Sequence, residues 1–203
     1  YGLVIYASAI IAYLRIVINF GFDVSATKKS SENREDKDKL SVIYSSVITL
    51  KLLIFFFSLL VTIPFLILIN YSDSILLLLF LGLCLQEIFF PVWLFQGLEE
   101  MKFITIISFA SNCLYVLLLF FFIKKETDYY LVPLFQSLGG VLTSVISSIL
   151  LNVKFKVRLV KIPLAQLKSD FKESVPFFAS RFSAIVMEKT NVILIGNFFT
   201  YDM

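Results

Sequence analysis

Hydrophobic stretches of about 20 residues recur along the chain, and a helix of that length crosses roughly 30 Å of hydrocarbon. Phe103 to Ile123 contains no charged residue, and Tyr129 to Val153 is a second uncharged stretch. Four further stretches lie at about 1–20, 44–72, 74–98 and 175–201. The pattern predicts six membrane-spanning helices separated by polar connections.

The composition supports an all-α integral membrane protein, a polytopic helical bundle. Hydrophobic residues make up 59% of the 203 positions and charged residues only 16%, against about 25% in soluble domains. The chain has no His, and its two Cys lie in separate stretches, so His metal sites and Cys-rich frameworks are excluded. We therefore expect no enzyme, metal or cofactor. Nucleic acid is not an expected partner, because the basic residues lie between hydrophobic stretches.

Lys and Arg are distributed unevenly among the connections, and cytoplasmic connections carry the excess in membrane proteins. The connections after the first, third and fifth spans hold five, one and six of these residues. Those after the second and fourth spans hold none and two. The bias fits six spans, places residues 21–43 and 154–174 in the cytoplasm, and starts the chain outside.

Two cytoplasmic segments have a helical pattern. Residues 30–43 are predicted to form a short helix that runs into the second span, with Ser30 or Ser31 as its cap. Residues 154–174 contain an amphipathic helix that we expect along the inner membrane surface. This linker divides the chain into a first group of five spans, 1–153, and a last span, 175–203. Both ends fall in spans, so we expect a piece of a longer protein.

Six charged residues fall inside the predicted spans, where a charge costs roughly 2.5–3.5 kcal/mol on insertion scales and is expected in a bundle interior or wet cavity. They are Arg15, Lys51, Glu87, Arg181, Glu188 and Lys189. The first, second and fourth of these lie within about two turns of a span end, so their long side chains could instead reach the headgroups. For Glu87 and the Glu188–Lys189 pair, the alternative is a structural ion pair.

Helical phasing places several of these charges on polar stripes. Ser8, Arg15 and Asn19 share one face of the first span. Lys51 and Ser58 share one face of the second span. Arg181 and Glu188, seven residues apart, lie near one face of the last span. Because cations exceed anions, the stripes suit an anionic cargo such as phosphate on a lipid. A transporter is favoured over a channel, since no repeated pore-loop sequence is visible.

Three segments carry a resemblance to a known family: GFDVSATKKSSENREDKDKLSVIYSSVITLK, PVWLFQGLEEMKFITI and SVPFFASRFSAIVMEKTNVILIGNF. They resemble the Wzx-type O-antigen flippases of the polysaccharide transporter group, in the multidrug/oligosaccharidyl-lipid/polysaccharide exporter superfamily. Members usually have about twelve spans in two lobes. The resemblance implies that this chain is about half of such a transporter, from the second span to the seventh, with residues 154–174 between the lobes.

The resemblance also implies a function. An undecaprenyl-diphosphate-linked O-antigen or related oligosaccharide unit would cross the bacterial inner membrane by alternating access, alongside membrane lipids, a polysaccharide polymerase and a chain-length regulator as partners. Arg15, Lys51, Arg181 and Lys189 would contact the diphosphate, and Glu87 and Glu188 would serve gating or ion coupling. The alternatives are a drug or cation exporter of the same superfamily, which suits an acidic cavity, and a membrane-embedded polysaccharide polymerase or ligase, which needs a large periplasmic loop.

Overall fold

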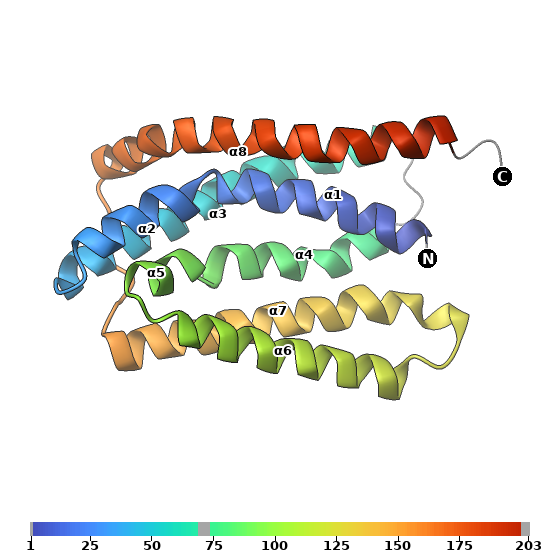
Figure 1. The fold of residues 1–203 in the computed structure, drawn as a ribbon, viewed down its shortest axis with the longest axis horizontal. Coiled ribbons are helices and arrows are strands. Elements are labelled where there is room, and N and C mark those ends of the chain that lie inside the picture. The colour runs from blue at the N-terminus through green and yellow to red at the C-terminus, as the bar shows by residue number, and fades with distance from the viewer. Residues whose placement is uncertain (1, 69–73, 200–203) are drawn as a thin grey trace.

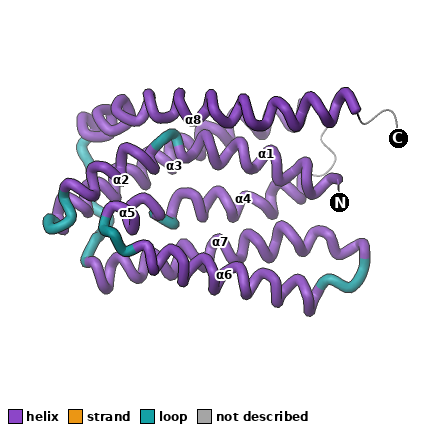
Figure 2. Tube along the Cα trace, viewed as in Figure 1, coloured by secondary structure: helices purple, strands orange, loops and turns teal. Residues whose placement is uncertain are grey.

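The chain forms an elongated bundle of helices that lie side by side (Figure 1). The computed structural model describes residues 2–68 and 74–199. Its elements are α1 (Gly2–Asn19), α2 (Phe22–Glu32), α3 (Lys37–Leu68), α4 (Ser74–Phe89), α5 (Val92–Gly97), α6 (Met101–Phe122), η1 (Glu126–Tyr130), α7 (Leu131–Leu150), the π-helix η2 (Leu151–Phe155) and α8 (Leu164–Phe199). The described connections gather mainly toward the ends of the bundle (Figure 2).

Among the described residues, five helical segments are long and apolar enough to cross a membrane. They are Ala7–Glu32, Lys37–Pro64, Ile75–Gly97, Met101–Phe122 and Asp128–Phe155. These segments match the first five predicted spans and confirm a multi-pass helical membrane bundle. The sixth predicted span falls in α8, where side chains from residue 184 onward lie outside the described residues.

The segment 21–43 differs from its prediction. Only Phe20 and Gly21 separate α1 from α2, and both have positive φ angles, 46° and 75°. The predicted helix over 30–43 is wrong, because α2 ends at Glu32 and α3 begins at Lys37. The Asp36 carboxylate accepts a hydrogen bond from the backbone N–H of Lys39 at 3.0 Å and caps α3. The sequence pattern predicts Ser30 or Ser31 as this cap.

The predicted surface helix and the sixth span form one helix, α8, with Pro176 inside it. The Phe20 ring at the corner between α1 and α2 is stacked between Phe171 and Phe178, with ring centroids 4.6 and 4.5 Å away. Two rings seven residues apart lie on the same face of a helix. The first turns of α8 therefore pack on the bundle instead of forming a separate surface helix.

Small residues bring α4, α6 and α7 close together. A Cβ added at Gly139 would lie 2.8 Å from Ser111 Oγ, and one added at Gly140 would lie 3.0 Å from Gln86 Oε1. Small residues at these positions allow the close helix approach that is common in membrane bundles. This packing fixes α4 at the centre of the bundle, with α1 on one side and α7 on the other (Figure 1).

Candidate functional site

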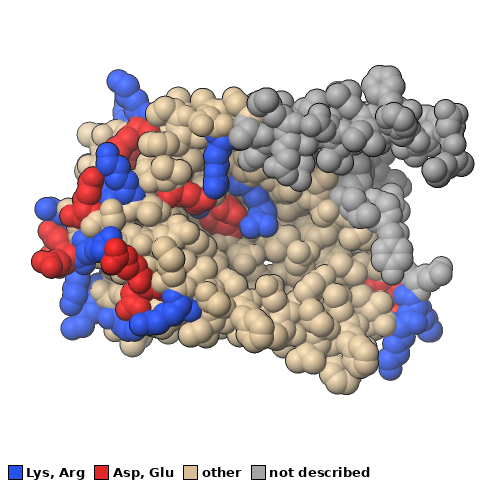
Figure 3. Space-filling model, viewed as in Figure 1, with Lys and Arg blue, Asp and Glu red and all other residues tan. Residues whose placement is uncertain are grey.

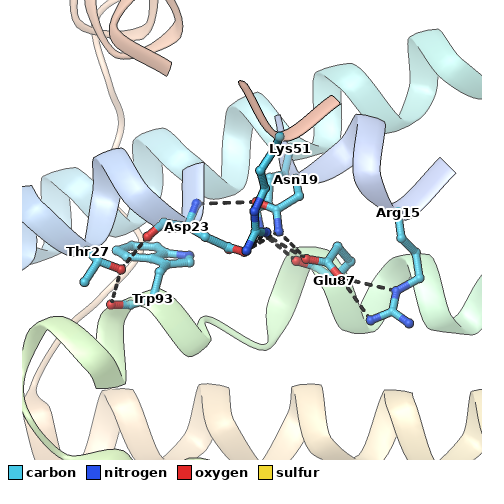
Figure 4. Close-up of polar contacts among 8 residues, drawn as sticks. Arg15, Asn19, Asp23, Thr27, Lys51, Glu87 and Trp93 are labelled. Carbon is cyan, nitrogen blue, oxygen red and sulfur yellow. Dashed lines mark hydrogen bonds and ion pairs between the residues drawn. The ribbon is translucent and has the colours of Figure 1, made fainter. Parts of the chain in front are cut away.

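A carboxylate on α4 joins three helices. Glu87 Oε2 accepts hydrogen bonds from Arg15 Nε at 3.2 Å and from Arg15 Nη2 at 3.0 Å. Its other oxygen accepts a bond from the Asn19 amide at 3.0 Å. Figure 4 shows these side chains of α1 and α4 pointing toward one another. The paired donors of a guanidinium match a carboxylate or a phosphate equally well.

Lys51 is buried beneath this carboxylate, with its side chain only 1% exposed. Its ammonium donates to the Glu87 backbone carbonyl at 2.9 Å and lies 3.7 Å from Glu87 Oε1. A buried charge requires such partners. The ammonium therefore points inward, and the alternative that Lys51 reaches lipid headgroups is excluded.

A second carboxylate, Asp23 on α2, extends the network. It accepts hydrogen bonds from the Asn19 amide nitrogen at 2.7 Å and from Arg181 Nη1 of α8 at 3.1 Å. The backbone carbonyl of Asp23 accepts the hydroxyl of Thr27, which also lies 3.3 Å from the carbonyl of Trp93. The Asn19 amide thus bridges the carboxylates of Asp23 and Glu87. Sequence reasoning missed Asp23 because it assigned residue 23 to a loop, although the four-residue spacing from Asn19 is a helical signal.

The charged side chains described above line one cavity of about 490 Å³, which lies among α1, α2, α3, α4, α5 and α8. Arg15, Lys51 and Arg181 all face it, together with the carboxylates of Asp23 and Glu87. Figure 3 shows charged atoms gathered at the ends of the molecule and a further charged group within an otherwise uncharged face. Three cations against two carboxylates leave an excess of one positive charge. This excess is smaller than the predicted one, because the prediction did not include Asp23.

The substrate-binding and coupling roles of all six predicted site residues stay predictions. The side chains of Glu188 and Lys189 lie outside the described residues, although their backbone belongs to α8. Within the described part of the chain, no group of three or more His, Cys, Asp or Glu side chains could hold a metal ion. The cavity can therefore offer, from its described residues, guanidinium and ammonium donors to an anion and two carboxylates to a cation.

The comparisons with known proteins agree with the resemblance drawn from the sequence. The family described as "Polysaccharide biosynthesis protein" matches residues 1–200. Two relatives are named "Putative O-antigen transporter": one from Escherichia coli strain K12, 24% identical over 98% of this chain, and one from Shigella dysenteriae, 26% identical over 93%. The matches cover 48% of each relative, so the chain spans about half their length.

No solved structure matches the chain. The family match extends over nearly the whole chain, from the span that carries Arg15 to the helix that carries Arg181. The chain therefore belongs to the polysaccharide biosynthesis protein family.

Proposed function

We propose that the whole protein is a flippase that moves an undecaprenyl-diphosphate-linked O-antigen or related oligosaccharide unit across the bacterial inner membrane. The observation that carries this proposal is the convergence of three cations from three helices, Arg15, Lys51 and Arg181, on one cavity inside a membrane bundle. The family and the names of the two relatives support the same role and give no indication of an enzyme.

The ion pairs of the cavity suggest how a diphosphate is bound. Glu87 pairs with the guanidinium group of Arg15, and Asp23 pairs with that of Arg181. A diphosphate offers the same oxygen geometry with more charge, so it can replace both carboxylates while the lipid tail stays in the bilayer. The released carboxylates would then be free to bind the coupling ion. Farther along α8, Lys189 would contact the diphosphate and Glu188 would serve gating or ion coupling. The excess of cations disfavours a cation exporter.

Replacing Arg181 by alanine should reduce surface polysaccharide about tenfold or more, because the cargo loses a charge-assisted contact. The measurement is complementation of a flippase deletion by the full-length variant, together with accumulation of the lipid-linked unit inside the cell. Arg34→Ala is the matched control, since Arg34 forms a surface ion pair with Glu99 at 2.8 Å. Full complementation by Arg181→Ala at normal protein level would remove Arg181 from the site.

Alternating access requires the second lobe to move against the first, and α8 joins the two, because it contains the end of the predicted linker 154–174 and the start of the second lobe. A buried carboxylate ties α8 to the first lobe. Asp170 accepts from the Lys29 ammonium at 2.6 Å and from the Ser46 hydroxyl, and Lys29 also pairs with Glu173 at 2.6 Å. Polar interfaces of this kind separate into water more readily than apolar ones. We propose that this contact opens in each transport cycle.

A disulfide between α2 and α8 tests this motion. The hydroxyls of Ser25 and Ser174 lie 2.8 Å apart, and both residues are buried. In a full-length protein without Cys84 and Cys113, the variant Ser25→Cys/Ser174→Cys should lose transport on oxidation and recover it with a reductant. Each single cysteine variant serves as a control. An oxidised, fully cross-linked double variant that transports at the normal rate would show that α2 and α8 stay together.

A further inference from the structure

A second cavity, of about 580 Å³, shares no lining residue with the central one. It lies between α3, the ends of α4 and α7, and the segment that connects η2 to α8. Tyr44 and Phe89 form part of its apolar wall, and Asn152 and Arg158 contribute polar side chains. The basic connections place this end of the bundle on the cytoplasmic side. Neither the proposed transport site nor the comparisons account for this cavity.

The backbone around Arg158 is fixed by two serines of α3. The N–H of Arg158 donates to the Ser41 hydroxyl oxygen at 3.1 Å, and the N–H of Val160 donates to that of Ser45 at 2.8 Å. Both serines are buried. Before this segment, Lys156 adopts a left-handed conformation with φ 57° and ends the π-helix. Only main-chain groups of Arg158 take part in these hydrogen bonds. Its backbone is therefore held in place, and its side chain is not used for the anchoring.

Arg158 is an exposed residue, and its guanidinium has no carboxylate partner among the residues that the structure describes. This distinguishes it from Arg15 and Arg181, which are both paired. Residues 151–163 include four basic residues and no acidic one. The second cavity is therefore lined by an arginine whose backbone is held in place and whose guanidinium has no carboxylate partner in the described part of the chain.

The chemistry of the lining defines a ligand class. Arg158 and the amide of Asn152 offer donors suited to a phosphate, which accepts paired bonds from a guanidinium. Phe89, Val157 and Leu159 add an apolar surface to the cavity. A free phosphate would gain nothing from this surface, whereas the glycerol and first methylenes of a lipid would pack against it. Basic pockets between helices on the cytoplasmic side are typical places for anionic headgroups.

We propose that this cavity binds the phosphate of an anionic membrane lipid from the cytoplasmic leaflet, with Arg158 as its principal contact. The proposal does not depend on the transport function assigned to the central cavity. Two lipids share the required chemistry: a bulk anionic phospholipid and a polyprenyl diphosphate. The first would make the cavity a structural lipid site. The second would make it a docking site for the cargo before translocation, and this reading alone rests on the proposed function.

Native mass spectrometry of the delipidated full-length protein tests the proposal. Phosphatidylglycerol, a polyprenyl diphosphate and zwitterionic phosphatidylcholine are each titrated against the wild type and against Arg158→Gln. We expect Arg158→Gln to weaken binding of at least one of the two anionic lipids about tenfold, the effect of losing one charge-assisted contact. Whichever anionic lipid shows the greater loss identifies the source of the phosphate. Phosphatidylcholine should bind weakly to both proteins.

Lys161→Gln is the matched control, because Lys161 carries the same charge in the same segment but does not line the cavity. Lipid binding to this variant should stay within about twofold of wild type, as expected for a solvent-screened surface charge outside the cavity. Asn152→Ala provides a second variant, which should weaken the same lipid by a smaller factor. Unchanged binding of both anionic lipids to a folded Arg158→Gln variant would overturn the proposal, as would equal losses in Arg158→Gln and Lys161→Gln.

Discussion

Gly21→Ala is expected to leave little correctly folded protein in the membrane. Gly21 has a φ of 75°, and an added Cβ would lie 2.7 Å from the backbone nitrogen of Phe178 and 2.9 Å from Phe177 Cβ. The left-handed backbone alone costs a residue with a Cβ about 1–2 kcal/mol. The overlap adds more, because the nearest atom belongs to the main chain of α8 and cannot rotate away. Either the corner between α1 and α2 must change, or α8 must move outward.

The measurement is the yield of monodisperse full-length protein and the midpoint of its thermal unfolding. Ala9→Val is the control, since Ala9 is exposed on the neighbouring helix α1 and its substitution also adds carbon atoms. Ala9→Val should behave like the wild type. If Gly21→Ala unfolds at the wild-type midpoint, α8 does not pack on this corner as the structure has it.

Glu87→Leu is expected to destabilise the protein by about 3 kcal/mol, at the lower end of the range for breaking a buried ion pair. The substitution removes the acceptor shared by Arg15 and Asn19 and leaves Lys51 with only the Glu87 main-chain carbonyl. The lower end applies because the Arg15 side chain is 39% exposed and can turn toward water, whereas the Lys51 side chain is 1% exposed and cannot.

Thermal unfolding of the purified full-length variants checks this expectation. Gln86→Leu is the control, because Gln86 precedes Glu87 on α4 and lines the same cavity without a charge. The double variant Glu87→Leu/Arg15→Leu should recover part of the loss, since fewer charges are then left unpaired. Equal stability of Glu87→Leu and Gln86→Leu would mean that the ion pairs contribute nothing measurable.

The spans were predictable from the sequence because hydrocarbon thickness imposes a minimum length on apolar helices. The cavity was predictable in part. Seven-residue spacing placed Arg15 and Lys51 on polar stripes, and both of these residues line the same cavity. The partners were not predictable, because phasing defines a face of one helix but not the neighbouring helix that covers it. Arg15 and Glu87 are 72 positions apart.

Asp23 and the segment around Asp36 show a different limit. The hydropathy pattern predicts that the first span ends near residue 20. The polar helix α2, which follows the corner, was therefore assigned to a loop. The structure continues through α2 because Phe22 and Ala26 are buried, while Asp23 and Lys29 form ion pairs with side chains of α8. Helix formers around residue 35 suggested continuity there, but Asp favours the cap position over the helix interior.

The Asn19 amide gives one nitrogen to two acids, and this makes the acids sensitive to each other. A carboxylate that takes up a proton or a metal cation becomes a poorer acceptor, so the amide shifts toward whichever acid is still charged. Occupation of Glu87 would therefore be felt at Asp23 and, through it, at Arg181 on α8. The Asn19 side chain thus provides a route by which cation binding at Glu87 would affect α8, which lines the same cavity.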